Sequence, residues 1–346
     1  MRITFIVRYL SDGGAERVTS LLASGMAAVG HEVAVVSFKR AENEYPLDGR
    51  VTLVYVPEGP FRSRVEALRG IVEDFAPGCI VSLGCKYDYM WAAGLFGKYK
   101  VILSERNDPA RKQPALKRAF TRLCYRRAWG VVFQTAYAND FFKGGVRRRV
   151  VIANPAPDGL PVWDAECHEK TVINCCRLTA QKNLPLLLRA FSVFHGTHPD
   201  YSLEICGDGD LGNSLWELAV DLGVQDAFRL SPYTADVHDC VAQSAMFVSS
   251  SDYEGISNSI IEALCMGVPT ISTDSRGGGS RALLEGGDCG ELVPCGDVQA
   301  LADAMSRIAD DGAYARKLSA RARGRSQSLS LGSICSQWIS FIERNV

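Results

Sequence analysis

Two glutamates around a glycine turn offer the clearest chemistry in this sequence. Glu254 and Gly255 follow an apolar stretch, and a helix is predicted to begin near Asn258, with seven residues separating Glu254 from Glu262. The first N–H groups of such a helix can bind a phosphate, and paired carboxylates can accept hydrogen bonds from sugar hydroxyls. A capping residue and a solvated glutamate are the alternative. Glu262 lies within an apolar helix, so its carboxylate needs a partner, and a ribose diol would serve.

Two cations follow a different predicted strand. Arg177 and Lys182 are five residues apart, just before a helix, and can converge on a diphosphate. Ordinary surface cations are the alternative for this segment. Gly13 and Gly14 form a strand-to-helix turn, which suits either phosphate binding or a tight turn. Residues 207–212 match G-x-G-x-x-G, but in the second βαβ unit of their domain rather than the first, so we do not expect a nicotinamide cofactor.

The elements that must position these residues alternate between short apolar runs and helical stretches, which predicts α/β domains with doubly wound parallel sheets. Predicted strands cover residues 3–7, 32–38, 51–56, 79–83, 101–104, 130–133, 171–175, 202–206, 227–230, 245–248, 270–272 and 291–293. Predicted helices of the first half cover residues 14–29, 63–75, 88–97, 115–127 and 137–142. Prolines and a glycine in residues 153–159 predict a linker. We therefore expect domains at 1–155 and 156–330, with a terminal helix in 331–346.

Charge is divided in the same way as the domains. Residues 1–160 carry 24 basic and 15 acidic side chains, a balance of +9, and the remainder carries 14 and 24, a balance of −10, within a total of −1. Two domains with different partners would explain this division. A hydrophobic content of 47% in 346 residues supports two cores and excludes a disordered chain.

Several other classes are excluded. No apolar run reaches the roughly 18 residues of a membrane span, and residues 1–7 read as a strand rather than a signal peptide, so we expect a cytoplasmic protein. Many of the 12 cysteines lie in apolar stretches, which does not suggest a disulfide framework. His195 and His198 have a metal-like spacing without other ligands nearby, so we expect no metal site.

Taken together, the motifs resemble the retaining family 4 glycosyltransferases (glycosyltransferase group 1), including those that build bacterial polysaccharides and lipid-linked glycans. The matching segments occur in the family's order across almost the whole chain: G-G-A-E-R at 13–17, C-R-L-T-A-Q-K-N at 176–183, C-G-D-G at 206–209, and E-G-I-S-N-S-I-I-E-A-L with M-G-V-P within 254–269. The resemblance implies the GT-B fold, two Rossmann-like domains facing each other across a cleft. It further implies an amino-terminal acceptor domain and a carboxyl-terminal nucleotide-sugar domain.

The resemblance also assigns roles. Arg177 and Lys182 would hold the donor diphosphate, Glu254 would contact the sugar hydroxyls, and Glu262 would bind the ribose diol. Further donor-site residues would be Gly13, Gly14, Gly207, Tyr233, Gly255, Ile256, Ser257 and Asn258. The loop in which many relatives carry a histidine reads S-E-R-N-D-P here, so that role is not transferred. Glu105 and Arg106 are candidates for the acceptor, together with Glu16, and a helix-capping or salt-bridged loop is the alternative for Glu105 and Arg106.

In this family a hexose or N-acetylhexosamine moves from a nucleotide sugar, here expected to be UDP-linked, to a glycan or lipid-linked acceptor with retained configuration. Cations and helix amides stabilise the leaving diphosphate, so we expect no metal and no other cofactor. A nucleotide-sugar epimerase or another GT-B enzyme, and a catalytically silent glycan-binding protein, are the alternatives.

Two further segments concern partners. Basic residues interleaved with apolar and aromatic ones across 111–129 suit an anionic membrane surface at the inner face of the cell membrane, with a solvated helix as the alternative. No recognition motif accompanies these cations, so we expect no nucleic acid. Ile334, Trp338, Phe341 and Ile342 form an apolar stripe at helical spacing. We expect this last helix to pack on the first domain, and a dimer contact is the alternative.

Overall fold

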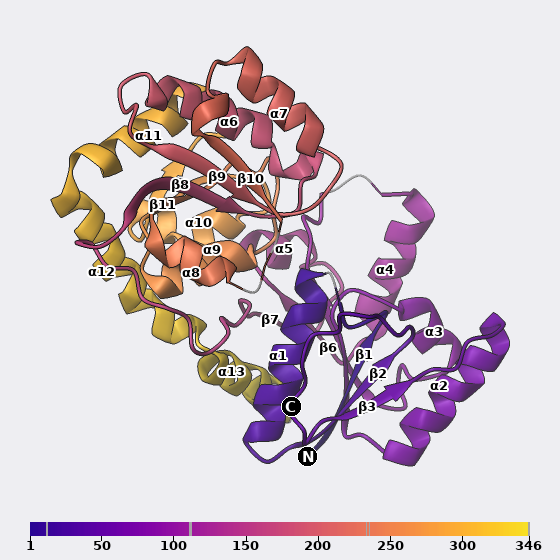
Figure 1. The fold of residues 1–346 in the computed structure, drawn as a ribbon. Coiled ribbons are helices and arrows are strands. Elements are labelled where there is room, and N and C mark those ends of the chain that lie inside the picture. Colours follow the sequence, from indigo (N-terminus) through magenta and orange to yellow (C-terminus); the bar gives the residue numbers. More distant parts are fainter. Residues whose placement is uncertain (12, 111–112, 233, 235, 345–346) are drawn as a thin grey trace. The chain divides into compact units, whose positions relative to one another are not determined.

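The computed structural model describes residues 1–346 apart from residues 12, 111–112, 233, 235 and 345–346. The chain divides into two compact units (Figure 1). Unit 1 comprises Met1–Pro155 and Ser330–Val346, and unit 2 comprises Ala156–Leu329. Each unit contains one parallel sheet with helices packed on it, which confirms the predicted fold class.

The described residues of unit 1 form a sheet of seven strands in the order β3-β2-β1-β4-β5-β6-β7, and every pair is parallel. The strands are β1 (Arg2–Val7), β2 (Glu32–Ser37), β3 (Thr52–Tyr55), β4 (Cys79–Ser82), β5 (Lys100–Glu105), β6 (Gly130–Phe133) and β7 (Arg149–Val151). Successive side chains of a strand face opposite sides of the sheet, so Phe5 enters one hydrophobic core and Ile6 the other. Burial on both faces explains why the central strands are continuous apolar runs.

The helices of unit 1 follow the prediction, with one clear difference. They are α1 (Gly14–Ala28), α2 (Phe61–Phe75), α3 (Tyr87–Ala92), α4 (Ala115–Arg127), α5 (Ala136–Phe141) and α13 (Leu331–Glu343). The predicted helix at 88–97 is wrong at its end, because α3 stops at Ala92. Gly94 and Gly97 take left-handed backbone conformations, with φ of 72° and 86°, and so cannot continue a helix.

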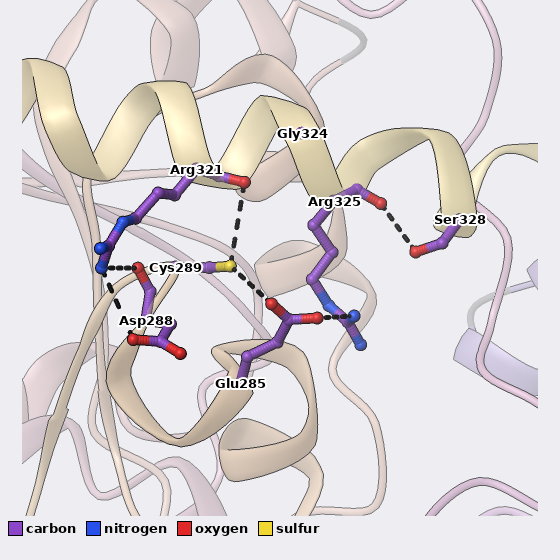
Figure 2. A pocket seen from close by; sticks show the side chains of 7 residues that line it. All are labelled: Glu285, Asp288, Cys289, Arg321, Gly324, Arg325 and Ser328. Carbon is purple, nitrogen blue, oxygen red and sulfur yellow. Dashed lines mark hydrogen bonds and ion pairs between the residues drawn. The ribbon is translucent and has the colours of Figure 1, made fainter.

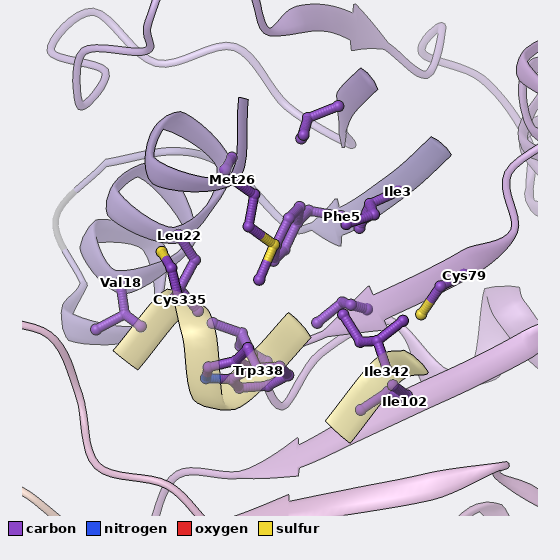
Figure 3. Packing of buried hydrophobic residues seen from close by; sticks show 14 of the residues in the cluster. Ile3, Phe5, Val18, Leu22, Met26, Cys79, Ile102, Cys335, Trp338 and Ile342 are labelled. Atoms are coloured by element: carbon purple, nitrogen blue, oxygen red, sulfur yellow. The ribbon is translucent and has the colours of Figure 1, made fainter. Parts of the chain in front are cut away.

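The C-terminal helix α13 packs in the core of unit 1 (Figure 3). Trp338 is completely buried, and with Ile334, Phe341 and Ile342 it joins side chains of α1 and β1 in one cluster. A Cβ atom added at Gly25 of α1 would lie 2.7 Å from the Cys335 sulfur, so the missing side chain allows α13 to approach closely. The apolar stripe of this helix is therefore covered within the chain.

Unit 2 contains a second parallel sheet, whose described strands run in the order β10-β9-β8-β11-β12-β13. They are β8 (Glu169–Cys175), β9 (Ser202–Cys206), β10 (Phe228–Ser231), β11 (Ser244–Ser249), β12 (Thr270–Thr273) and β13 (Glu291–Val293). The helices are α6 (Leu184–His195), α7 (Gly212–Asp221), α8 (Val237–Gln243), α9 (Asn258–Met266), α10 (Gly279–Leu283), α11 (Val298–Asp310) and α12 (Gly312–Leu329), with short 3₁₀ turns η1 (Ala180–Lys182), η2 (Gln225–Ala227) and η3 (Glu285–Gly287). Strands β8, β11 and β12 are neighbours, so the loops that follow them meet at one edge.

Candidate functional site

The loops after β8 and β11 are joined by hydrogen bonds at the carboxyl edge of the unit 2 sheet. The Gln181 side-chain amide donates to the Tyr253 carbonyl at 2.8 Å, and the Asp252 backbone N–H donates to the Gln181 carbonyl at 3.0 Å. The Asn183 side-chain amide donates to the Asp252 carboxylate at 2.7 Å. These bonds place the predicted diphosphate-binding segment beside the predicted sugar-binding segment.

Lys182 and Glu254 form an ion pair between these two loops. The Lys182 ammonium donates to Glu254 Oε1, which also accepts a hydrogen bond from the Ser251 hydroxyl at 3.3 Å. The two side chains are only 13% and 11% exposed. The Glu254 backbone N–H donates to the Arg276 carbonyl at 3.1 Å, which anchors the same loop to the segment after β12. The pair holds both groups in fixed positions at the edge of the sheet.

Arg177 supplies a second, less restrained cation. Its side chain is exposed, and no carboxylate of the described residues lies within ion-pair distance of it. Burial raises the pKa of the neighbouring Cys176 thiol to about 11, and Lys182 and Arg177 offset only part of that rise. The thiol stays protonated near neutral pH, so Cys176 is not an activated nucleophile.

Helix α9 begins where the prediction placed it, at Asn258. Ser257 is the N-cap residue, with extended backbone angles, and its carbonyl accepts the N–H of Ile261 at 3.2 Å. The first turn of a helix leaves N–H groups without intrahelical acceptors, which favours an anion at this end. A Cβ atom added at Gly279 would lie 1.4 Å from the Gly255 carbonyl oxygen, so the start of α10 packs directly against the turn.

The structure gives Glu262 a protein partner that the sequence did not predict. Glu262 is buried in α9, and its Oε2 lies 3.1 Å from Nε2 of His238 on α8. We expected a ribose diol to satisfy this carboxylate. The structure shows that the His238 imidazole is also one of its partners. A single histidine in a polar stretch of sequence gives no signal of such a contact, because helix packing brings it there.

A glycine is required at position 207 because the backbone of Cys176 passes very close to it. A Cβ atom at this position would lie 1.8 Å from the Cys176 carbonyl oxygen, and the Gly207 N–H donates to the Ser231 carbonyl at 2.8 Å. The glycine therefore packs the loop after β9 against the loop that carries the two cations. Tyr233, predicted to lie near the base, is outside the described residues.

The glycine turn of unit 1 contains Gly13, Gly14 and Glu16, and α1 begins at Gly14. Gly13 is the N-cap residue, and its carbonyl accepts the N–H of Arg17 at 3.0 Å. A Cβ atom at Gly13 would lie 1.9 Å from a carboxylate oxygen of Glu16. The side chain of Glu16 thus folds back over the turn, at the carboxyl end of β1.

Glu105 and Arg106 lie in a network of hydrogen bonds after β5. The Glu105 carboxylate accepts the Tyr125 hydroxyl at 2.8 Å and the backbone N–H groups of Arg106 and Asn107 at 3.1 and 3.2 Å. The Arg106 guanidinium donates to the Asn154 side chain. Burial raises the pKa of Glu105 and lowers that of Arg106 to about 10. The Glu105 carboxylate is thus held by a hydroxyl and two backbone N–H groups of its own loop, and an acceptor role for Glu105 and Arg106 stays a prediction.

The two spaced histidines have separate partners. His195 Nδ1 lies 3.1 Å from the Tyr201 carbonyl oxygen, and His198 Nε2 lies 3.0 Å from an Asp310 carboxylate oxygen. Among the residues that the structure describes, no group of three or more histidine, cysteine or acidic side chains is arranged to hold a metal ion.

An open pocket of about 530 Å³ lies elsewhere in unit 2, between the segment around η3 and helix α12 (Figure 2). Its two arginines are paired, Arg325 with Glu285 and Arg321 with Asp288. Burial raises the pKa of the Cys289 thiol to about 11. None of the predicted site residues lines this pocket.

Comparison with known families gives two adjoining matches. Residues 13–155 match a glycosyl transferase 4-like domain, and residues 163–325 match glycosyl transferases group 1. A protein from Campylobacter jejuni is 25% identical over 99% of this chain and 98% of its own length. That protein is named GalNAc-alpha-(1->4)-GalNAc-alpha-(1->3)-diNAcBac-PP-undecaprenol alpha-1,4-N-acetyl-D-galactosaminyltransferase. An uncharacterized glycosyltransferase of Haemophilus influenzae is 22% identical over 96% of this chain and 97% of its own.

Solved structures share the fold over nearly the full chain. HepE from Anabaena, solved in complex with UDP-glucose, has a TM-score of 0.82 at 18% identity, and covers 98% of each chain. WaaG, a glycosyltransferase involved in lipopolysaccharide biosynthesis, has a TM-score of 0.76 at 13% identity, over 99% of this chain and 100% of its own. At this identity the likeness establishes the fold, which is the predicted GT-B fold.

Proposed function

We propose a function for this chain, which belongs to the group 1, family 4 glycosyltransferases. It transfers a hexose or N-acetylhexosamine from a UDP-sugar donor to a glycan or lipid-linked acceptor, and the anomeric configuration is retained. One observation carries the proposal. Arg177, the Lys182–Glu254 pair and the start of α9 lie together at the carboxyl edge of a parallel sheet, where such sheets bind nucleotides. The Campylobacter relative, named for a lipid-linked substrate, supports the choice of acceptor class.

Each of these groups has a distinct task in our proposal. Lys182 and Arg177 bind the diphosphate, and the first turn of α9 contributes N–H groups to the same anion. Glu254 accepts hydrogen bonds from the hydroxyls of the transferred sugar. Glu262, held by His238, accepts the two hydroxyls of the ribose.

The reaction breaks the bond between the anomeric carbon and the diphosphate oxygen. Negative charge then grows on that oxygen, and the cations and helix amides stabilise it without a metal ion or other cofactor. The acceptor oxygen forms the new bond on the same face of the sugar. The departing diphosphate takes the proton from the acceptor hydroxyl, so no side chain is needed as a nucleophile.

Donor binding and product stereochemistry test the proposal. Thermal shift with a panel of nucleotide sugars should show a higher melting temperature with the donor, and UDP-linked sugars should give the largest effect. Nuclear magnetic resonance of the product, or of the sugar released by slow hydrolysis, should show the anomeric configuration of the donor. Inverted product would exclude the retaining mechanism. An isomerised sugar nucleotide would indicate an epimerase, and no nucleotide binding by calorimetry would indicate a silent glycan-binding protein.

The exposed apolar and basic side chains of helix α4 suggest that the acceptor is bound at a membrane surface. Leu116 and Leu123 are 83% and 44% exposed, and they are interleaved with Lys117, Arg118 and Arg122. We propose that this helix rests on an anionic lipid surface at the cytoplasmic face of the cell membrane. Among the described residues, no helix has both the length and the apolar character needed to span a membrane. The basic residues at 111–112 lie outside the described residues.

Liposome flotation tests the membrane proposal. The protein should float with vesicles that contain anionic phospholipid and should remain at the bottom with neutral vesicles, and high salt should abolish flotation. Replacing Lys117 and Arg118 with Gln should reduce flotation, while Lys98→Gln, a paired cation outside α4, should not. If the protein binds neither kind of vesicle, the membrane proposal is refuted.

A further inference from the structure

The carboxyl edge of the unit 1 sheet carries a group of cations and aromatic rings that has no role in the proposed donor site. Its members follow β1, β2 and β4, which are neighbours in the sheet, or lie on α2 and α3. We call the set the cation–aromatic cluster: Arg8, Phe38, Phe61, Arg64, Lys86 and Tyr89. Because ligands of open parallel sheets bind beyond the carboxyl ends of the strands, this position is one where a ligand is expected.

Two cations of the cluster lie over the same pair of rings. Lys86 Nζ is 4.6 Å from the ring centroid of Phe38 and 4.7 Å from that of Tyr89. The guanidinium carbon of Arg64 is 5.0 and 5.7 Å from the same two centroids. The rings themselves pack edge to face, with centroids 4.6 Å apart. Cation–π attraction therefore holds two like charges close together.

Those charges are not neutralised by nearby carboxylates. Within the described part of the chain, no acidic side chain lies within ion-pair distance of Arg8, Arg64 or Lys86. Burial lowers the pKa of Lys86, and the charges of Arg64 and Arg8 lower it further, against the opposing effect of Asp88. The Arg64 guanidinium donates to the Phe38 carbonyl, but its Nε is buried without a hydrogen-bond partner. An anion bound here would relieve the mutual repulsion.

The backbone fixes the position of the central lysine. Gly84 and Lys86 both take left-handed conformations, with φ of 89° and 58°. Such a conformation is unfavourable for lysine and persists where surrounding contacts enforce it, often at ligand sites. The Lys86 carbonyl accepts the Met90 N–H at 3.0 Å, which ties the loop to the start of α3. The backbone of Lys86 is thus fixed at the point from which its side chain reaches the two rings.

We propose that the cation–aromatic cluster binds an anionic group carried by a sugar of the acceptor, either a phosphate or a carboxylate. The inference rests on the proposed transferase function and adds the chemical class of its acceptor. Lys86, Arg64 and Arg8 bind the anion. Phe61, which is 48% exposed and 4.6 Å from Tyr89 between ring centroids, offers an apolar face to the sugar ring.

Isothermal titration with simple sugars tests this inference on the full-length chain. Glucose 1-phosphate, glucuronic acid and glucose are titrated in turn, with and without saturating UDP, which fills the proposed donor site. At least one anionic sugar should bind about tenfold or more tightly than glucose, because a charge-assisted hydrogen bond is worth at least that factor. Preference for glucose 1-phosphate identifies phosphate as the group recognised, and preference for glucuronic acid identifies a carboxylate.

The variants Lys86→Gln and Arg64→Gln should each weaken binding of the preferred anionic sugar by about tenfold. Lys98→Gln is the matched control, since Lys98 pairs with Glu73 and is not a member of the cluster. The affinity for UDP should be the same in all four proteins, which shows that unit 2 is undisturbed. Equal binding of the three sugars, or no effect of Lys86→Gln, would overturn the inference. Absence of UDP binding in the unaltered chain would instead refute the proposed function.

Discussion

The ion pair between Lys182 and Glu254 makes a prediction about stability as well as activity. Replacing Lys182 with Ala should reduce transfer to near zero, because the diphosphate loses a fixed cation. Loss of one preorganised charge-stabilising group lowers turnover by about a hundredfold to a thousandfold. The same change should also destabilise unit 2, because it leaves the Glu254 carboxylate without its ammonium partner.

The size of that destabilisation follows from the burial of the pair. Breaking a buried ion pair by removing one partner costs about 3–5 kcal/mol. Glu254 keeps the Ser251 hydroxyl at 3.3 Å and is 11% exposed, so we expect the lower end of that range, about 3 kcal/mol. Lys98 and Glu73 are the control pair, since they are 57% and 45% exposed and contribute about 0–1 kcal/mol.

Native-state hydrogen exchange, read by mass spectrometry of peptides, measures the two units separately. Lys182→Ala should lower protection in unit 2 and leave unit 1 unchanged, and Lys98→Ala should change unit 1 only slightly. The double variant Lys182→Ala, Glu254→Ala should be more stable than Lys182→Ala alone, because it removes the unpaired carboxylate. If Lys182→Ala costs no more than Lys98→Ala, the reasoning from burial is refuted. If it transfers sugar at a near-normal rate, the diphosphate assignment is refuted.

Three further predictions concern single contacts. His238→Ala should raise the Kd for UDP about tenfold, because Glu262 loses the imidazole 3.1 Å away, and it should leave the Kd for 2′,3′-dideoxy-UDP unchanged. Equal loss for both nucleotides would contradict the ribose role. Gly207→Ala should destabilise unit 2 by about 1–3 kcal/mol in thermal unfolding, because its Cβ would overlap a backbone carbonyl oxygen at 1.8 Å. Gly49→Ala, whose Cβ meets nothing within 4 Å, is the control, and similar melting of the two variants would contradict the clash. Burial raises the pKa of Glu105 above its ordinary 4.5, so the unfolded chain ionises this carboxyl first as the pH rises. Its contribution to stability is therefore complete below about pH 4.5 and lost as the pH passes the folded pKa, and Glu105→Gln should flatten that decline in urea unfolding measured between about pH 4 and pH 7. If Glu105→Gln leaves the pH profile of stability unchanged, this prediction is contradicted.

Periodicity was sufficient to predict most of the strands. Their side chains are buried on both faces, so they appear as continuous apolar runs bounded by turns. Strand β7 was not predicted, because it has three residues, begins with Arg149 and is half exposed at the sheet edge. The end of α3 was misplaced, since its residues beyond Ala92 are apolar and only the backbone at Gly94 stops the helix.

The candidate site was predicted in its parts but not in its contacts. Loops after parallel strands converge, so the sequence places Arg177, Lys182 and Glu254 near one another. It does not show that Lys182 and Glu254 pair directly, because they are 72 residues apart and their separation depends on strand register. His238 and Glu262 meet only through the packing of α8 on α9. Such contacts depend on tertiary structure, which local residue pattern does not encode.

The return of α13 to unit 1 reverses the usual order of domain completion during translation. Domains generally fold as units, with the N-terminal domain first as the chain leaves the ribosome. Here the contiguous residues Ala156–Leu329 of unit 2 are all synthesised before α13, which supplies Trp338 to the core of unit 1. The first domain to begin is therefore the last to be finished. Until then the apolar side chains of α1 and β1 that pack on α13 lack this cover, so the N-terminal half carries an uncovered apolar surface while unit 2 is made.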